Sequence, residues 1–410
     1  MLASVIAQTA NNSWAHVGEV PGGIDVLAGR DLGLETTVGL LLPDGDDYRW
    51  LCHESVVGSD FFLTPRYARN AEGVLLTALG LLDVGTDLRE SVYRSTDGCG
   101  WAAPEGLTDR IVVDVAFNPQ DADQVGAVTG HLAGTAEFSG NALLVSEDAG
   151  ATWNASALEG LDRVFRGLHW SADGATIWAT SVWFVPPGAW IHRSTDGGET
   201  WQEHAHDFVL DGERWTVLDV LLGHPDDAEV AFLRQAGETG DRLYRASGGG
   251  AVLEELLYLP DRAEIHDAAW VDGDLFVAST VGVYIVQDGR GAATSWPGGA
   301  GDVRGLAHSD QGLHVVYGPD QGHLMATFPA SGPQVDFTNV VGPIVCPQGS
   351  TSAERCDVLW PGLEATLPRP EEIRGDDDDS AAPPVDSCDC EGGSAAWVVL
   401  GIAAVPRRKR

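Results

Sequence analysis

A short aromatic segment is the strongest candidate for ligand binding in this chain of 410 residues. Trp183, Phe184 and Trp190 stand on either side of two prolines, in a stretch that we expect to be an insertion between strands. Aromatic rings displayed on such a loop can stack against a sugar ring or a peptide. The spacing also fits the buried side of a strand, and we prefer that interpretation for Trp178. The segment therefore predicts a binding surface at Trp183, Phe184 and Trp190, with burial in the core as the alternative.

Metal ligands are the second kind of chemistry that the residue types allow. His204 and His206 have the spacing of two side chains that point to one side of a strand. Two histidines without a third ligand nearby are more typical of a solvated turn. The Asp-rich runs at residues 44–47 and 376–379 lack the spacing and the final glutamate of a calcium-binding loop. The sequence therefore predicts neither a metal site nor a cofactor.

The charge of the chain excludes several classes of partner. Asp and Glu number 61 against 24 Lys and Arg, which gives a formal net charge of −37. Binding to nucleic acid needs a basic surface, and so does binding to an anionic membrane surface. Hydrophobic residues make up 44% of the chain, which is enough for a sizeable core. We therefore expect a folded protein that binds neither nucleic acid nor anionic lipid.

One short motif, Ser-x-Asp-x-Gly-x-Thr-Trp, recurs along the chain. It is complete at residues 146–153 and 194–201, and it is one residue short at 95–101. An Asp in a tight turn can accept hydrogen bonds from the backbone N–H groups of that turn. A Gly supplies a positive φ angle, and a Trp covers the turn with apolar surface. The motif predicts structural hairpin turns that contain Ser95, Asp97, Trp101, Ser146, Asp148, Gly150, Trp153, Ser194, Asp196, Gly198 and Trp201.

The motif is part of a longer repeat. Positions equivalent to its serine recur at residues 42, 95, 146, 194, 246, 286 and 326. A second apolar run precedes the copies, with examples that begin at residues 114, 167, 219, 267 and 305. Short apolar runs separated by Gly, Asp and Asn-Pro turns are typical of strands, and no segment before the C-terminal tail has a helical period. The repeat therefore predicts an all-β, seven-bladed β-propeller over residues 14–342.

The recurring motif resembles the Asp-box, or BNR, repeat. The resemblance covers about residues 14–342, and it implies that the Asp-box residues are structural and lie away from the ligand face. Sialidases share this repeat, but the resemblance to them would also require three arginines around a carboxylate, a Tyr–Glu pair and a Phe/Tyr-Arg-Ile-Pro segment. This chain has Thr-Pro-Arg-Tyr-Ala-Arg at residues 64–69 instead. Another propeller glycosidase stays possible, because such an enzyme needs only two suitably spaced carboxylates.

The C-terminal end has the composition of a sorting signal. An acidic Pro/Ala-rich linker at residues 371–387, which we expect to be disordered, precedes an apolar stretch at 395–405. As a helix this stretch would span about 16 Å, against roughly 30 Å of bilayer hydrocarbon, which suits a transient anchor. The order of features in residues 388–410 resembles the MYXO-CTERM signal of myxobacterial surface proteins. The residues that carry the resemblance are Cys388, Cys390, Arg407, Arg408, Lys409 and Arg410.

The resemblance of the tail implies export by a Gram-negative, myxobacterium-like cell, removal of the tail and retention at the cell surface. The membrane would be reached only through this signal. The apolar residues 1–10 agree with export, because they could be the remnant of a secretory signal peptide. A short disordered N-terminus is the alternative for that segment.

The remaining cysteines fit an exported protein with disulfides. Cys346 and Cys356 flank a segment rich in Ser, Thr, Gly and Pro, so they could close a small loop within residues 343–370. Cys52 and Cys99 occupy similar places in consecutive repeats, so they could join adjacent blades. Four cysteines allow three pairings, and the sequence does not decide among them.

These observations favour an exported, monomeric cell-surface propeller that acts as a binding or adhesion module. We expect its ligand, a glycan or a protein, at the central channel. A surface glycan hydrolase and a structural coat protein are the alternatives. Two acids about 5–10 Å apart in a pocket lined by arginine would favour the hydrolase. A channel lined by apolar and neutral groups would favour the binding module.

Overall fold

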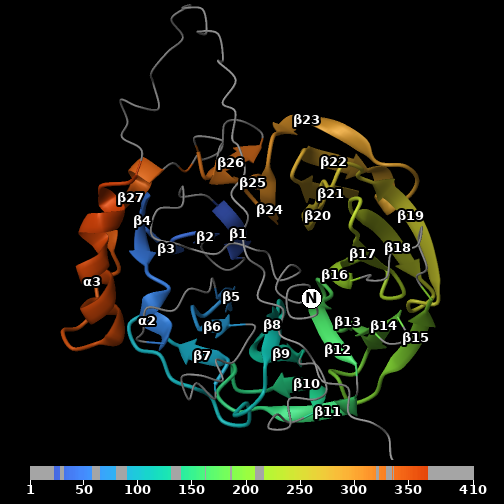
Figure 1. Ribbon diagram of the computed structural model, residues 1–410, viewed down its shortest axis with the longest axis horizontal. Helices are drawn as coiled ribbons and strands as arrows, with labels where there is room; N and C mark the ends of the chain where they lie inside the picture. Colours follow the sequence, from blue (N-terminus) through green and yellow to red (C-terminus); the bar gives the residue numbers. More distant parts are fainter. Residues whose placement is uncertain are drawn as a thin grey trace, which may run out of the picture. The chain divides into compact units, whose positions relative to one another are not determined.

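The fold is a seven-bladed β-propeller, as the repeat predicts. The computed structural model describes residues 23–27, 32–57, 65–79, 90–130, 140–161, 163–184, 187–207, 217–319, 323–328, 335 and 337–367. Within these residues, seven sheets follow one another around a central axis (Figure 1). The first strand of each sheet lies nearest the axis, and the later strands lie progressively farther out.

The sheets are numbered as blades 1 to 7 in chain order. Blade 1 contains β1 (Gly23–Leu27), β2 (Gly33–Thr36), β3 (Gly39–Asp44), β4 (Asp47–Leu51) and β27 (Val340–Pro343). Blade 2 contains β5 (Arg66–Arg69), β6 (Leu75–Ala78) and β7 (Val92–Ser95), and blade 3 contains β8 (Val112–Asn118), β9 (Asp121–Thr129), β10 (Asn141–Ser146) and β11 (Asn154–Leu161). Blade 4 contains β12 (Val164–Trp170), β13 (Ile177–Phe184), β14 (Pro187–Ser194) and β15 (Gln202–His206).

The second half of the ring follows the same order. Blade 5 contains β16 (Val217–Gly223), β17 (Ala231–Ala236), β18 (Arg242–Ser247) and β19 (Val252–Tyr258). Blade 6 contains β20 (Ile265–Val271), β21 (Asp274–Ser279), β22 (Gly282–Val286) and β23 (Thr294–Ala300), with the 3-10 helix η1 (Gln287–Gly289) between the last two. Blade 7 contains β24 (Val303–Ser309), β25 (Gly312–Tyr317) and β26 (Met325–Phe328), and the 3-10 helix η3 (Phe337–Asn339) follows it.

The predicted phase of the repeat is correct in every blade. The seven positions equivalent to the motif serine fall in β3, β7, β10, β14, β18, β22 and β26, each the third strand of its sheet. The preceding apolar runs form the innermost strands. Hydrophobic side chains between neighbouring blades form the core, and one cluster joins Trp178 and Ile191 of blade 4 to Leu218 and Leu233 of blade 5. Trp178 is only 1% exposed, which confirms its expected place in the core.

The strand order gives the propeller two different faces. Within a blade, consecutive strands are antiparallel, so alternate turns lie on opposite sides of the ring. The turns between first and second strands and between third and fourth strands lie on one side, here named the turn face. The turns between second and third strands, and the connections between blades, lie on the other side, here named the connection face. Every innermost strand therefore begins at the connection face.

The chain closes the ring at blade 1. Strand β27 pairs in parallel with β4, at the outer edge of the blade that contains the first described residues. The helix α3 (Thr351–Glu364) follows and packs against β4, β27 and the short helix α2 (Glu54–Val57). Trp360 of α3 lies 5.8 Å from Trp50 of β4 between ring centroids. The last described part of the chain therefore completes the outer wall of the first blade.

The four expected cysteines form two disulfides, but the suggested pairing is wrong. Cys52 bonds to Cys356, and Cys99 bonds to Cys346. The reason is that residues 346–356 do not form a small closed loop. They lead into α3, whose N-terminus is capped by Ser350 through a hydrogen bond from the backbone N–H of Ala353. Each disulfide therefore ties this segment to one of the first two blades.

Several sequence-based predictions lie outside the described residues. These are the signal remnant at 1–10, the acidic linker at 371–387 and the sorting signal at 388–410, with Cys388, Cys390 and the final cations. Among the helices that the structure describes, none is long and apolar enough to cross a membrane.

Candidate functional site

A ring of seven equivalent residues surrounds the axis near the connection face. In five innermost strands, a β-bulge lies directly before the ring residue. Bulges of this kind re-aim side chains and often border functional sites. The seven positions, here named the central ring, are Asp25, Arg66, Asp114, Gly167, Asp219, Asp267 and Gly305.

The place of Arg66 in this ring follows from a matching asparagine. Asn70 follows Arg66 by the same interval at which Asn118 follows Asp114. Asn70 Nδ2 donates to the carbonyl of Ala122 in the next blade, and Asn118 Nδ2 donates to that of Gly174 in its own next blade. The two strands therefore occupy the same register in their blades. Arg66 is the one cation of the central ring, all seven members of which are described.

Two ring aspartates join neighbouring blades through their backbone. Asp114 Oδ1 accepts a hydrogen bond from the next N–H in its strand, and Oδ2 accepts one from Leu168 N of blade 4, at 3.0 Å. Asp267 makes the same pair of contacts, with Leu306 N of blade 7 at 2.7 Å. Hydrogen bonds to an ionised acceptor are among the stronger ones in proteins. Both oxygens of each carboxylate are thus occupied, so these two residues serve the assembly of the ring.

The boundary between blades 1 and 2 departs from this arrangement. Asp25 Oδ1 accepts the N–H of Val26, as the Oδ1 atoms of Asp114 and Asp267 accept the next N–H in their strands. The neighbouring blade, however, is reached by Glu35 of the second strand, whose Oε2 accepts the N–H of Tyr67 at 3.4 Å. Among the described residues, Asp25 Oδ2 makes no hydrogen bond. The replacement therefore leaves one carboxylate oxygen of Asp25 available at the centre of the propeller.

Arg66 belongs to the same ring as this free oxygen. Its side chain is exposed to solvent although it lies at the axis. Within the described part of the chain it makes no hydrogen bond and no ion pair, and it interacts at longer range with Asp25, Glu35, Asp114 and Asp219. A structural arginine in a folded core would be paired with one of these acids. Arg66 is therefore an unengaged donor in a predominantly acidic ring.

The acids around Arg66 have strongly altered proton affinities. Burial, followed by the negative charge of Asp25, raises the pKa of Glu35 to about 8. Burial likewise raises the pKa of Asp25 to about 6, against the opposing effects of the Val26 N–H and of Arg66. The pKa of Asp267 is also raised, first by burial and then by Asp25. Near neutral pH the centre therefore holds both protonated and ionised carboxyl groups.

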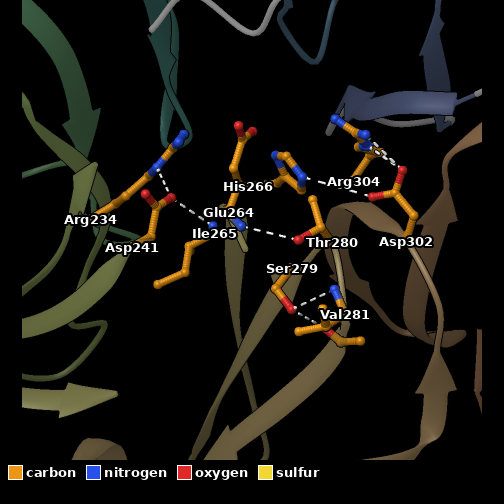
Figure 2. A network of polar contacts seen from close by, with 11 residues as sticks. Arg234, Asp241, Glu264, Ile265, His266, Ser279, Thr280, Val281, Asp302 and Arg304 are labelled. Atoms are coloured by element: carbon orange, nitrogen blue, oxygen red, sulfur yellow. Dashed lines mark hydrogen bonds and ion pairs between the residues drawn. The ribbon is translucent and has the colours of Figure 1, made fainter. Parts of the chain in front are cut away.

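A second charged cluster lies where blades 5, 6 and 7 meet (Figure 2). Arg234 Nε donates to Asp241 Oδ2 at 2.7 Å, and the same oxygen accepts the N–H of Ile265 from the next blade. Arg304 Nε donates to Asp302 Oδ2 at 2.8 Å. These contacts satisfy both arginines and tie three blades together. The cluster therefore offers fewer free donors than the surroundings of Arg66.

His266 is the unusual member of the second cluster. Its side chain is fully buried, and neither ring nitrogen has a hydrogen-bond partner among the residues that the structure describes. Nε2 lies 3.8 Å from Asp302 Oδ1, beyond hydrogen-bond length. Burial, together with Arg304 and Arg234, lowers the pKa of His266 to about 2. Figure 2 shows Glu264 beside this ring, between the two arginines. The imidazole is therefore neutral and sealed from solvent.

The aromatic segment has a different structure from the predicted one. Trp183 and Trp190 lie in β13 and β14, which pair along their whole length as one long hairpin. The expected insertion between strands is therefore wrong, because the strands themselves extend to the connection face. Trp183 and Trp190 are half-buried, and the guanidinium carbon of Arg163 lies 4.1 Å from the ring centroid of Trp190. Phe184 belongs to β13, and its side chain is outside the described set. One face of Trp190 is thus already covered by protein.

The two histidines considered as metal ligands lie in β15. His206 Nε2 contacts the carbonyl of Gly250 at 2.7 Å, and His204 Nε2 contacts the amide of Gln202. No group of three or more potential metal ligands occurs among the residues that the structure describes. His206 therefore links the outer strand of blade 4 to blade 5, and His204 contacts a residue of its own strand.

Two of the three motif turns form the same network of hydrogen bonds, and the third retains part of it. Ser146 Oγ donates to Asp148 Oδ1 at 2.8 Å and accepts the N–H of Gly150. Asp148 also accepts the N–H and hydroxyl of Thr152. The turn at residues 194–201 repeats these contacts, and the turn at 95–101 retains the serine and aspartate part of them. All three lie on the turn face, opposite the start of the innermost strands.

Blade 4 contains a Ser–His–Glu arrangement that sequence reasoning did not detect. Ser181 Oγ lies 2.8 Å from His192 Nε2, and His192 Nδ1 lies 3.4 Å from Glu203 Oε2. The order of groups is that of a hydrolase triad. Ser181 and His192 are completely buried, however, and Phe165 packs 5.3 Å from the imidazole. No substrate can reach this serine, so the arrangement is a buried polar network.

Comparisons with known proteins support the fold alone. No family model and no curated protein matches the chain. A puromycin-hydrolysing peptidase of Mycobacterium tuberculosis is similar in structure, with 12% identity, a TM-score of 0.50, and coverage of 80% of this chain and 54% of that one. The extracellular domain of a hybrid two-component system from B. thetaiotaomicron has 11% identity, a TM-score of 0.50, and coverage of 73% and 37%. An ancestral GH74 enzyme has 14% identity, a TM-score of 0.49, and coverage of 78% and 47%. The chain thus spans about half or less of the length of these structures.

Proposed function

We propose that the chain is an exported, cell-surface β-propeller that acts as a binding module and takes its ligand at the central ring. Two disulfides support export, because such bonds persist in oxidising compartments. We also propose that its motif turns are Asp-box repeats, on the support of their common hydrogen-bond network. The sorting role of residues 388–410, in a myxobacterium-like cell, remains part of this proposal.

Arg66 is the observation that carries the proposal. Asp114 and Asp267 use both carboxylate oxygens to join blades, so they have little to offer a ligand. Arg66 is exposed and unpaired among the described residues, and a free oxygen of Asp25 lies in the same ring. A donor and an acceptor with solvent access are what a hydrogen-bonding ligand needs. The half-buried Trp183 and Trp190 lie toward the same face and remain secondary candidates.

The composition of the centre bears on the alternatives. Acids and arginines surround the axis, which is the lining that we expected of a glycan hydrolase rather than of a simple binding module. The full use of Asp114 and Asp267 by backbone groups removes two of these acids from consideration as catalysts. Asp219 is paired with Arg166 at 3.5 Å, so the hydrolase alternative depends on Asp25 and Glu35.

Binding of the full-length chain to glycan and peptide arrays tests the proposal. The Arg66→Gln variant should lose at least tenfold in affinity for any array ligand that the wild type binds. The matched control is Arg49→Gln, which removes the same charge from blade 1 where Arg49 pairs with Asp44 away from the axis. Equal binding by all three proteins would show that the ligand does not use the central ring.

A further inference from the structure

Two carboxyl groups of blade 1 form a pair. Asp25 of β1 and Glu35 of β2 are direct cross-strand partners, so their side chains leave the same side of the sheet. Such partners have Cβ atoms roughly 4.5–5.5 Å apart. Glu35 is 5% exposed, whereas Asp25 is half-buried. The pair thus combines one sheltered carboxyl group with one that solvent can reach.

The surroundings of Asp25 and Glu35 favour different protonation states of the two carboxyl groups. Asp25 receives the N–H of Val26 and lies near the Arg66 cation, both of which favour its ionised form. Glu35 is more deeply buried, and its long contact to the Tyr67 N–H gives its charge little stabilisation. Carboxyl pairs whose environments favour opposite protonation states are typical of acid–base catalysis. The pair also occupies a blade boundary where a carboxylate of the second strand replaces the repeated Asp contact, and departures from a repeat are characteristic of functional sites.

We propose that Asp25 and Glu35 are a catalytic acid pair that hydrolyses a glycosidic bond in a neutral glycan held at the central ring. This inference rests on the proposed ligand site. Side chains that leave a sheet with Cβ atoms roughly 4.5–5.5 Å apart can bring their carboxyl groups to the separation of about 5 Å at which glycosidases retain configuration. Sequence reasoning missed the pair because neither residue belongs to a recognisable motif.

The reaction proceeds in two balanced steps. In the first, Asp25 Oδ2 attacks the anomeric carbon, the glycosidic C–O bond breaks, and Glu35 gives its proton to the departing oxygen. In the second, the Glu35 carboxylate takes a proton from water. The water oxygen bonds to the anomeric carbon as the ester bond to Asp25 breaks. Asp25 returns as a carboxylate and Glu35 returns protonated, so the net change is addition of one water molecule.

The charges at the centre select the substrate class. Arg66 is the one ring cation, while Asp25, Asp114 and Asp219 all interact with it as carboxylates. Arg166 Nε lies 3.5 Å from Asp219, so its charge is already engaged. A negative charge on the sugar would meet mainly acids. Among the described residues, Arg166, Arg234 and Arg304 are already paired with aspartates, so they are not free to hold a sialic acid carboxylate. Hydroxyl groups, which donate to Asp25 and accept from Arg66, suit the centre better.

Activated substrates test the pair directly. The probes are 2,4-dinitrophenyl glycosides of glucose, galactose, mannose and xylose, together with their 2-deoxy-2-fluoro analogues. We expect the full-length wild type to release dinitrophenol from at least one probe. Asp25→Asn should lower kcat/KM by about 100-fold or more. The fluoro analogue should add one glycosyl group to the peptide that contains Asp25. Glu35→Gln should leave that first step in place and slow the second, with azide restoring turnover as a glycosyl azide of retained configuration.

The two variants preserve the contacts that hold the ring. Asn at 25 can still accept the N–H of Val26, and Gln at 35 can still accept that of Tyr67. Asp46→Asn on the exposed turn of blade 1 is the matched control, and it should keep full activity. No turnover of any probe by the wild type overturns the proposal, as does turnover that survives in both variants. A neutral glycan that binds the array but is not cleaved would overturn catalysis and leave the binding proposal intact. An absence of both binding and cleavage would overturn both.

Discussion

Leu168 at the start of blade 4 donates its backbone N–H to Asp114 Oδ2 of blade 3, with an N···O distance of 3.0 Å. The same carboxylate accepts the N–H of Val115 in its own strand. Asp267 repeats this geometry between blades 6 and 7 with Leu306. Carboxyl side chains thus join the innermost strands of blades 3 and 4, and those of blades 6 and 7, through backbone N–H groups. Apolar packing between blades has no direction of its own, whereas these hydrogen bonds fix the relative height of adjacent strands.

Replacing Asp114 should weaken the whole propeller. Asp114→Ala leaves two N–H groups in the ring without their acceptor, and we expect a loss of about 2–3 kcal/mol in the free energy of unfolding. Asp114→Asn, which keeps one acceptor oxygen, should cost less. Urea denaturation followed by tryptophan fluorescence measures both. The exposed Asp46→Ala should be neutral by comparison, and an equally small effect at Asp114 would disprove its joining role.

Turnover should show a bell-shaped dependence on pH. Asp25 must be ionised to attack and Glu35 must be protonated to donate, so kcat/KM should rise as pH passes about 6 and fall as it passes about 8. Removing the Arg66 charge should move the rising limb to higher pH, because Arg66 favours the Asp25 carboxylate. Initial rates with a dinitrophenyl glycoside between pH 4.5 and pH 9.5, as an approximate range, provide the measurement. A rising limb that stays in place in Arg66→Gln would contradict the assigned interaction.

The free energy of unfolding should also depend on pH through the titration of Glu35. Its pKa rises on folding from an ordinary value of 4.5 to about 8. A carboxyl group that binds its proton more tightly in the folded state favours folding at low pH. That contribution is lost as pH rises from about 4.5 through about 8, by on the order of a few kcal/mol.

Glu35→Gln removes this titration. The variant should therefore be similar to the wild type near pH 5, and it should be the more stable protein near pH 9. Urea midpoints across this range test the difference, with Glu264→Gln, an exposed acid of the second cluster, as the control. Parallel curves for the wild type and Glu35→Gln would mean that Glu35 titrates normally in the folded chain.

The blades could be predicted from sequence because their signals are local. In the complete motif, the serine ends a third strand, and the aspartate and glycine form the turn that follows. The tryptophan then covers this turn, so four neighbouring residues indicate one hairpin. Repetition of the equivalent positions every 40 to 53 residues then predicts the number of blades. The long hairpin that carries Trp183 could not be predicted, because its two prolines are typical of a loop. In the structure, Pro187 pairs with Phe184 at the tip of the hairpin.

The central ring could not be predicted, because it depends on contacts between residues far apart in sequence. Arg66 stood in a segment that was considered only for its lack of a sialidase signature. Arg66 can be recognised as a candidate binding residue only in the folded chain, where it interacts with Asp25, Asp114 and Asp219 of three other strands. Arg66 stands where the other six repeats have Asp or Gly. A cation at such a position is a sequence signal that could indicate a functional residue.

The disulfides provide the last test, since their connectivity was also beyond local signals. Cys52–Cys356 and Cys99–Cys346 close very long loops, with sequence separations of 304 and 247. Replacing the Cys52–Cys356 pair by serine should cost roughly 2–5 kcal/mol in the free energy of unfolding. Removing the second pair as well should cost nearly as much again, because the entropy of closing a loop depends only on the logarithm of its length. Peptide mapping without reduction should find both links and no Cys346–Cys356 bond. Thermal denaturation of the single and double variants measures the losses, and a second removal without cost would show that α3 is held to blades 1 and 2 by packing alone.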